Sequence, residues 1–449
     1  MKRRNFLKLA GGALTAVAAT LPGMNSPTDR PNFLFILSDD HGIMDAGCYG
    51  NPVIKTPNID ALAAEGLLFH RAFTPAAMCA PSRSSLFTGL NPHRHGCYMN
   101  HGSVNEEVQS IPHFLGELGY RVGLAGKTHI KPQEAFPFEY MDLTLDAIEE
   151  FIDRSNKEPF CLFVATNDPH AEKIGSRRGF RPSSLYDSGE IPLPPYLVDT
   201  ADTREQRAGY YDLVTRLDSL VGDIAALIDE LNASENTLFT YASDHGASFP
   251  FEKWTCYEAG LNLPMVMRWP GKIEPGRRTG AMVSFIDIVP TLIDLAGGSP
   301  TTFDFDGKSF KSVLLENTTK HHEYIMGTHT TEGIVNGSYY PVRSIRDERY
   351  KYIHNTNSDG FFTNIITASE NQAGWGSWLQ KAKHDPFAAR QVRLYQKRPR
   401  EEVYDLKHDP HEMRNLQSDP AYGEIKNYLK TQLTDWMRMQ NDPELNHME

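Results

Sequence analysis

The stretch Asn32-Phe33-Leu34-Phe35-Ile36-Leu37 is a near-continuous apolar run that ends in the polar sequence Ser38-Asp39-Asp40-His41-Gly42. Such a run is typical of a strand that is buried on both faces of a parallel sheet. The same design recurs at 160–165, followed by Asn167-Asp168-Pro169-His170, and at 237–242, followed by Ser243-Asp244-His245-Gly246. Segments with apolar residues at helical spacing separate these runs, at 58–65, 111–118 and 204–231. Strands that alternate with helices predict a doubly wound α/β core.

Polar residues with metal-binding chemistry stand at the ends of two of these predicted strands. Asp39 and Asp40 follow the first, and Asp244 and His245 follow the third. In open α/β sheets ligands bind outside the carboxyl ends of the strands, and carboxylate oxygens suit Ca²⁺ or Mg²⁺. Each pair taken alone is equally typical of a turn or a helix cap. His245 departs from an all-oxygen ligand set.

A second region begins near Thr302. Residues 327–346 and 350–354 have the pattern of antiparallel strands, and residues 422–437 have the pattern of an amphipathic helix. Residues 361–400 are polar with aromatic interruptions and carry no clear period. The sequence therefore predicts an α/β domain over 30–301 and a smaller α+β subdomain over 302–449.

The charge balance excludes one class of partner. The 449 residues carry a formal net charge of −12, so no overall basic surface predicts nucleic-acid binding. An anionic substrate would need a local cationic pocket, because the overall field repels it.

The N-terminus predicts export. Residues 1–23 combine the basic segment Lys2-Arg3-Arg4-Asn5-Phe6-Leu7-Lys8 with a short apolar run that is too short to span a bilayer permanently. The paired arginines resemble a bacterial twin-arginine signal, which predicts a periplasmic or secreted protein without stable membrane insertion. Beyond Cys79, the four cysteines Cys48, Cys97, Cys161 and Cys256 would allow at most two disulfides.

Cys79-Ala80-Pro81-Ser82-Arg83 is the most specific short motif in the chain. A free cysteine is most often a small buried hydrophobe, so this motif indicates a function only together with other motifs. The chain contains three such motifs: Gly126-Lys127-Thr128-His129, Asp168-Pro169-His170 and Lys253-Trp254-Thr255-Cys256-Tyr257-Glu258-Ala259-Gly260.

Together these elements resemble, in order, the motifs of the type I sulfatases, which belong to the alkaline-phosphatase-like superfamily. The resemblance runs from about Pro31 to the C-terminus. It implies a mixed sheet flanked by helices, with a smaller C-terminal antiparallel sheet and helix. It also implies that 30–301 is the catalytic domain and that the subdomain 302–449 contributes to the substrate pocket. It also implies that a maturation enzyme oxidises Cys79 to formylglycine (3-oxoalanine), whose hydrate acts as the nucleophile, and that one Ca²⁺ is held by Asp39, Asp40, Asp244 and His245.

The resemblance also implies roles for the other polar residues. Arg83 would stabilise the alkoxide, Lys127 and Lys253 would bind sulfate oxygens, His170 would protonate the leaving group and His129 would hold the second hydroxyl. Three cations in an acidic chain are what a preorganised sulfate site requires.

Within that family the chain most resembles the sulfamidase subgroup, through Gly126-Lys127-Thr128-His129, Asn167-Asp168-Pro169-His170 and Tyr340-Pro341-Val342-Arg343-Ser344-Ile345. This likeness implies a sulfated saccharide substrate, with N-sulfated glucosamine as one candidate and another O-sulfated glycan, such as an algal one, as the alternative. Glu332 and Arg343 are candidates for contacts beyond the sulfate group. Taken singly, either charge is equally typical of a solvated strand.

Two rival functions remain open from the residues. A phosphoesterase of the same superfamily would bind two transition metals and use Ser or Thr as nucleophile, against which the C-x-P-x-R run argues. A glycan-binding homologue with an inactive site would not need Asp39, Asp40, Asp244, Lys127 and His129 together. The sequence leaves the glycan, the sulfate position and the oligomeric state open.

Overall fold

The structure is a computed structural model that describes residues 30–154, 158–174, 177–334, 337–368 and 373–448. The predicted export signal at 1–23 lies outside the described residues. Within them, none of the helices combines the length and the apolar character that crossing a membrane would require.

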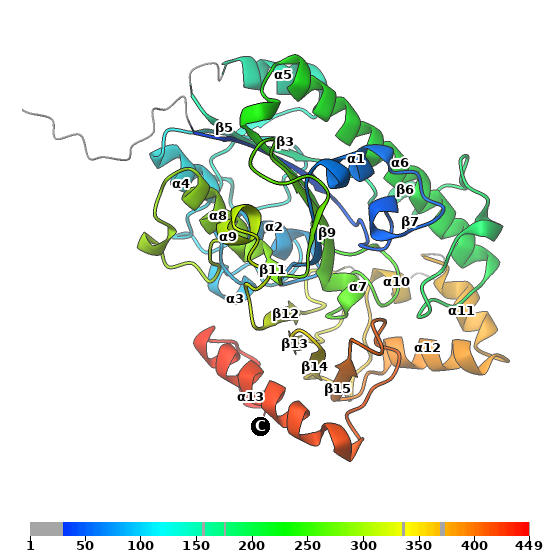
Figure 1. Ribbon diagram of the computed structural model, residues 1–449. Coiled ribbons are helices and arrows are strands. Elements are labelled where there is room, and N and C mark those ends of the chain that lie inside the picture. The colour runs from blue at the N-terminus through cyan, green and yellow to red at the C-terminus, as the bar shows by residue number, and fades with distance from the viewer. Residues whose placement is uncertain (1–29, 155–157, 175–176, 335–336, 369–372, 449) are drawn as a thin grey trace, which may run out of the picture.

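A nine-stranded mixed sheet forms the centre of the larger part of the molecule (Figure 1). β1, β3, β4, β5 and β8 run parallel to one another, and β9 pairs antiparallel with both β8 and β2. β11 (Val283–Ser284) pairs with β2 off the main path. The strand order is β10 (Arg277–Thr279), β2 (Leu67–Phe73), β9 (Asn262–Arg268), β8 (Thr237–Ser243), β1 (Asn32–Ser38), β5 (Phe160–Ala165), β3 (Arg121–Gly126), β4 (Glu139–Met141).

Helices cover both faces of this sheet, which explains why its central strands are continuously apolar. Phe33, Phe35 and Leu37 of β1 share a core with α2 (Cys79–Thr88), α4 (Ile111–Glu117) and α8 (Ile288–Leu295). The alternate residues Leu34 and Ile36 share a second core with α1 (Pro57–Glu65), α5 (Leu145–Arg154) and α6 (Ala201–Glu230). Because successive side chains of a strand point to opposite faces, the doubly wound prediction is confirmed.

The C-terminal region contains a four-stranded antiparallel sheet, as predicted. Its order is β12 (Ile325–His329), β13 (Val342–Arg346), β14 (Tyr350–Asn355), β15 (Glu401–Asp405). α13 (Gly423–Met439) packs on it through Leu429, Leu433 and Met437, and lies below the sheet in Figure 1.

The segment 361–400, for which the sequence offered no assignment, is largely helical. It contains α10 (Ile365–Ala368), α11 (Trp375–Lys381) and α12 (Pro386–Gln396). Asp385 caps α12 by accepting a hydrogen bond from the Ala388 amide. The remaining short elements are α3 (Pro92–His95), β6 (Glu172–Ile174), β7 (Arg177–Gly179), α7 (Glu258–Leu261) and α9 (Lys311–Leu315).

One hydrophobic core joins the two regions. Ala77 and Met78, immediately before α2, belong to the same buried cluster as Val342 of β13 and Tyr395 of α12. A backbone hydrogen bond links the two regions as well: the Thr328 amide of β12 donates to the Pro75 carbonyl at 2.8 Å. The C-terminal sheet thus packs directly against the chain that leads into Cys79.

Candidate active site

The parallel register of the central strands brings the predicted metal ligands together. Ser38 of β1 pairs with Ser243 of β8, so Asp39 and Asp244 leave the sheet side by side. The Asp244 amide donates to the Ser38 carbonyl at 3.1 Å. His170 follows β5, the other parallel neighbour of β1.

A glycine turn places Lys127 at the same edge. Gly126, the last residue of β3, has a φ of 86°, in the left-handed region that favours glycine. A Cβ atom there would lie 2.4 Å from the Ala165 carbonyl oxygen. The Lys127 amide then donates to that same carbonyl at 2.8 Å, so the glycine is needed where the chain turns toward the site.

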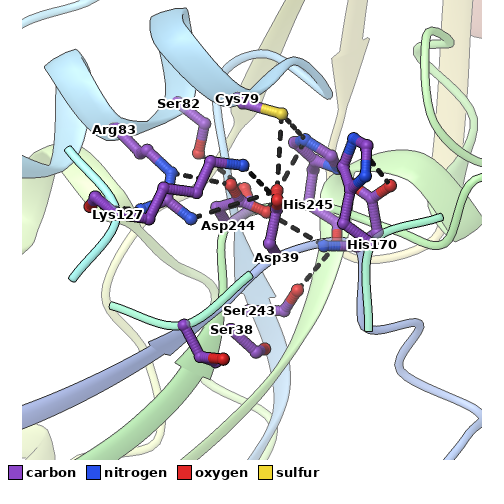
Figure 2. A network of polar contacts seen from close by, with 12 residues as sticks. Ser38, Asp39, Cys79, Ser82, Arg83, Lys127, His170, Ser243, Asp244 and His245 are labelled. Carbon is purple, nitrogen blue, oxygen red and sulfur yellow. Dashed lines mark hydrogen bonds and ion pairs between the residues drawn. The ribbon is translucent and has the colours of Figure 1, made fainter. Parts of the chain in front are cut away.

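Cys79 is the first residue of α2 and points into the centre of the polar network (Figure 2). Its Sγ lies 3.4 Å from Asp39 Oδ1, 3.2 Å from His245 Nε2 and 3.4 Å from Lys253 Nζ. Burial and Asp39 would raise the pKa of this thiol, but Lys253, Lys127 and His245 lower that pKa to about 6. The side chain at position 79 therefore sits where an anion is stabilised.

Each of the three buried carboxylates is paired with a cation. Lys127 Nζ bonds Asp39, Lys253 Nζ lies 2.6 Å from Asp40 Oδ1, and Arg83 Nε lies 3.0 Å from Asp244 Oδ2. Figure 2 shows Arg83 reaching Asp244 from one side of the network. Burial would raise the pKa of Asp39, but Lys127, His170 and Lys253 hold that pKa well below its ordinary value.

The donor set fits a calcium ion. The carboxylates of Asp39, Asp40 and Asp244 are completely buried, and Asp40 Oδ2 has no hydrogen-bond partner among the described residues. Oxygen-rich clusters of this kind suit Ca²⁺, which takes six to eight oxygen ligands. Cys79, His245, Asp39 and Asp244 each offer a ligand atom, and these atoms lie within 4.8 Å of one another.

Two histidines face the same space from different loops. His129 Nε2 lies 2.6 Å from His101 Nδ1, and burial together with Lys127 and Arg83 lowers the pKa of His129 to about 4. His129 is therefore neutral at neutral pH. His170 Nε2 lies 3.9 Å from Asp40 Oδ2.

A cavity of about 290 Å³ opens above Cys79. The predicted residues Asp39, Lys127, His129, His170 and Lys253 line it. Asn100 and His101, which sequence reasoning missed, line it too, because no motif marks them and only the fold brings them to His129. The remaining lining residues are Asn167, Ser248, Trp254, Gly333, Ile334 and Ile365.

Glu332 and Arg343 stand apart from that cavity. Arg343 is buried and makes a two-pronged ion pair with Asp442, at 2.5 Å from Nε to Oδ2 and 2.8 Å from Nη2 to Oδ1. With Glu332 it lines a separate hollow of only about 20 Å³. The Arg343 guanidinium is therefore not exposed to solvent, and the buried Asp442 carboxylate neutralises its charge. Glu332 lies nearer the site, since its carbonyl accepts from the Asn100 amide at 3.3 Å.

The five cysteines, all of them among the described residues, are free. None of the disulfides that the count allowed is formed.

Two protein-family models match the chain. The family model "Sulfatase" matches residues 31–140 and 131–299. The model "N-sulphoglucosamine sulphohydrolase, C-terminal" matches residues 245–365.

The relatives are named for sulfate hydrolysis. An ulvan-active sulfatase of Formosa agariphila is 35% identical over 432 residues, covering 92% of this chain and 81% of the relative. The human N-sulphoglucosamine sulphohydrolase is 29% identical, covering 92% and 91%. A solved structure in complex with its substrate D-glucosamine-2-N,6-O-disulfate shares the fold, with a TM-score of 0.70, 20% identity and coverage of 94% of this chain and 100% of that one. The family models and the extent of these matches show that the chain belongs to the sulfatase family.

Proposed function

We propose that this sulfatase is an exported sulfohydrolase that releases inorganic sulfate from sulfated saccharides, with formylglycine at position 79 as nucleophile. The observation that carries the proposal is the position of Cys79. It lies on the first turn of α2, close to the buried carboxylates of Asp39 and Asp244 and beside Lys127 and Lys253, at a cavity large enough for a small sugar. In a chain of net charge −12, the lysines at this cavity and a Ca²⁺ ion on the carboxylates would select an anion by local rather than overall charge.

Two groups that the family generally uses fit these residues. Formylglycine made from Cys79 would supply the nucleophilic hydroxyl through its hydrate, and Ca²⁺ on Asp39, Asp40, Asp244 and His245 would supply positive charge for the sulfate oxygens. The fit rests on the buried, unpartnered Asp40 Oδ2 and on the convergence of ligand atoms around Cys79.

The chain's own residues have separate tasks in this proposal. Lys127 and Lys253 bind sulfate oxygens and stabilise the negative charge that builds up in the transition state. Arg83, wholly buried on α2 beside Asp244 and Asp39, fixes the carboxylates and favours the deprotonated hydroxyl at position 79. His170, at the cavity wall, protonates the departing oxygen or nitrogen. His129, neutral and held by His101, receives the proton from the second hydroxyl.

The relatives support a saccharide substrate and favour two candidates. The match of residues 245–365 to the C-terminal model of N-sulphoglucosamine sulphohydrolase favours N-sulfated glucosamine. The ulvan-active relative favours an O-sulfated algal saccharide. Glu332, whose backbone carbonyl accepts a hydrogen bond from the amide of the cavity residue Asn100, is our candidate for a sugar contact beyond the sulfate. The buried pair of Arg343 with Asp442 favours an indirect, positioning role for this residue over the sugar contact that the sequence predicts.

The first experiment tests the nucleophile. Protein from the native host should carry formylglycine at position 79 by peptide mass spectrometry, and Cys79→Ala should abolish turnover while leaving the unfolding temperature within about 2 °C, since the side chain lost is small. A fully active preparation that contains only cysteine at position 79 would refute the mechanism.

The second experiment tests the substrate. Release of sulfate is measured on N-sulfated glucosamine, 6-O-sulfated glucosamine and sulfated ulvan oligosaccharides, with a small aryl sulfate as reference. We expect at least one saccharide to be hydrolysed with a higher kcat/KM than the aryl sulfate. Activity confined to phosphate esters, together with two bound Zn²⁺, would instead support a phosphoesterase. Binding of the saccharides without turnover by protein that carries formylglycine would support an inactive glycan-binding homologue.

A further inference from the structure

A second cluster of metal-ligating side chains lies away from Cys79. Asp287 ends the short 3₁₀ helix Phe285–Asp287 that precedes α8. His321 and His322 lie in the connection between α9 and β12. His322 Nε2 is 2.8 Å from Asp287 Oδ2, and His321 Nε2 is 3.3 Å from the same oxygen. The three side chains therefore bring two imidazole nitrogens and one carboxylate to a single point.

Backbone contacts hold this cluster in place. The Ser284 amide donates to Asp287 Oδ2 at 2.7 Å, and the Lys308 amide donates to Oδ1 at 2.9 Å. Lys308 Nζ donates to the His321 carbonyl at 2.9 Å, and the His322 amide donates to the Met282 carbonyl at 3.2 Å. Both the carboxylate and the two histidines are thus positioned before any ligand arrives.

One atom of the cluster is left unsatisfied. The side chain of His321 is 5% exposed, yet its Nε2 has no hydrogen-bond partner among the described residues, although it points toward Asp287. A buried polar group without a partner costs free energy. His321 Nε2 thus lies 3.3 Å from Asp287 Oδ2 without a well-aligned hydrogen bond to it, whereas His322 Nε2 is hydrogen-bonded to both carboxylate oxygens.

We propose that Asp287, His321 and His322 form a binding site for a divalent transition-metal ion, with Zn²⁺ as the best fit. Imidazole nitrogens prefer Zn²⁺ over Ca²⁺, which takes oxygen ligands. In a tetrahedral zinc site with bonds of about 2.0–2.1 Å, neighbouring ligand atoms lie about 3.3 Å apart. His321 Nε2 and Asp287 Oδ2 have that separation, and His322 Nε2, which is 2.8 Å from the same oxygen, would move outward by about half an ångström to bind the ion.

The site has room for a fourth ligand. His322 lines a cavity of about 700 Å³ together with Ser284, Asp306 and Gln440, so a water molecule can reach the metal from that side. The bound ion would tie the connection that leads into β12 to the start of α8. It would thereby fasten the C-terminal sheet to the large sheet at a point separate from the catalytic residues.

Zinc stoichiometry tests the proposal. Mature, calcium-loaded protein is equilibrated with Zn²⁺, desalted and analysed for metal per chain, beside the double variant His321→Gln/His322→Gln. Glutamine retains an N–H that can donate to Asp287 but is a poor zinc ligand. We expect wild type to hold one more Zn²⁺ per chain than the double variant, and Zn²⁺ to raise the unfolding temperature of wild type only.

A matched control and a second probe distinguish this site from others. His408→Gln removes an exposed histidine that also pairs with an aspartate, Asp405, at 2.9 Å, and it should retain the extra Zn²⁺. Co²⁺ added in place of Zn²⁺ should give visible bands of a tetrahedral nitrogen–oxygen site. A thiolate-to-cobalt charge-transfer band would place the ion at a cysteine rather than at Asp287, His321 and His322, and would overturn the proposal. So would zinc content that is equal in wild type and the double variant, or a wild type that binds no zinc, whether or not the variant folds.

Discussion

Replacing Arg343 with alanine should destabilise the protein rather than alter its choice of substrate. Arg343 and Asp442 are 3% and 4% exposed, and their two short contacts make each the other's main charge partner. Arg343 Nη1 also donates to the carbonyls of His329 and Val342, at 3.2 and 3.0 Å. Arg343→Ala would leave the Asp442 carboxylate buried without its arginine.

The expected cost follows from that burial. Removing one partner of a buried ion pair destabilises a protein by about 3–5 kcal/mol. A chain of this length has an unfolding entropy of about 0.9 kcal/mol/K, at ~2.1 cal/mol/K per residue. The unfolding temperature should therefore fall by about 3–5 °C, as measured by differential scanning calorimetry. Activity at a temperature where the variant is folded should fall equally on a sulfated saccharide and on an aryl sulfate.

A double-mutant cycle provides the control. Arg343→Met with Asp442→Leu replaces the pair by apolar side chains, which is often nearly neutral for a buried pair, so the double variant should regain most of the lost stability. The reasoning would be refuted if Arg343→Ala kept the wild-type unfolding temperature. A loss of saccharide turnover without an equal loss of aryl sulfate turnover in that variant would indicate that Arg343 contacts the substrate.

Three further results are expected. Lys253→Ala should lower kcat/KM by about 10²–10³-fold, the usual loss on removing one donor to a transition-state oxyanion, with little change in KM; unchanged kcat/KM in steady-state assays would remove Lys253 from the site. Asp244→Asn should reduce the rise in unfolding temperature that Ca²⁺ gives wild type, since an ion that binds only the folded state stabilises it; an equal rise in both proteins would contradict the ligand assignment. Burial raises the pKa of Glu412 from 4.5 to about 7, against the opposing effect of Lys351, so the folded protein retains a proton that the unfolded chain loses. The free energy of unfolding should therefore fall as pH rises from about 4.5 to about 7, and urea titrations should show a smaller fall for Glu412→Gln.

The sequence predicted the central sheet closely, because its strands are buried on both faces and are therefore continuously apolar. The predicted run 160–165 coincides with β5, and β1 extends one residue further, to Ser38. The helices at 365–396 were not predicted, because only a few residues in each are buried. Trp375 and Trp378 are such residues, too sparse to establish a period.

The chemistry of the site could be predicted from motifs, but its pairing could not. Residue types and order suggested three carboxylates at the strand ends and three cations, from other motifs, around the same anion. Which cation meets which carboxylate depends on the path of the chain, and the pairing of Arg83 with Asp244 appears only in the fold. His101 shows the same limit, since its contact with His129 joins two loops that no sequence pattern links. Arg343 was a candidate sugar contact, because its buried partner, Asp442, lies almost a hundred residues away and no sequence pattern links the two.

The core that joins the two regions has a consequence for how this enzyme can be shortened. A gene that stops after residue 301 would still encode the motif residues from Asp39 to Lys253. The product would expose Ala77 and Met78, whose buried cluster draws on β13 and α12, and the Pro75 carbonyl would lose the amide of Thr328. The start of α2, which presents Cys79, would then rest on an apolar surface open to water, of the kind that leads to aggregation. The minimal catalytic unit is therefore the whole chain from β1 to α13, and exchanging C-terminal segments between relatives would require grafting the apolar contacts beneath Cys79 along with the pocket wall.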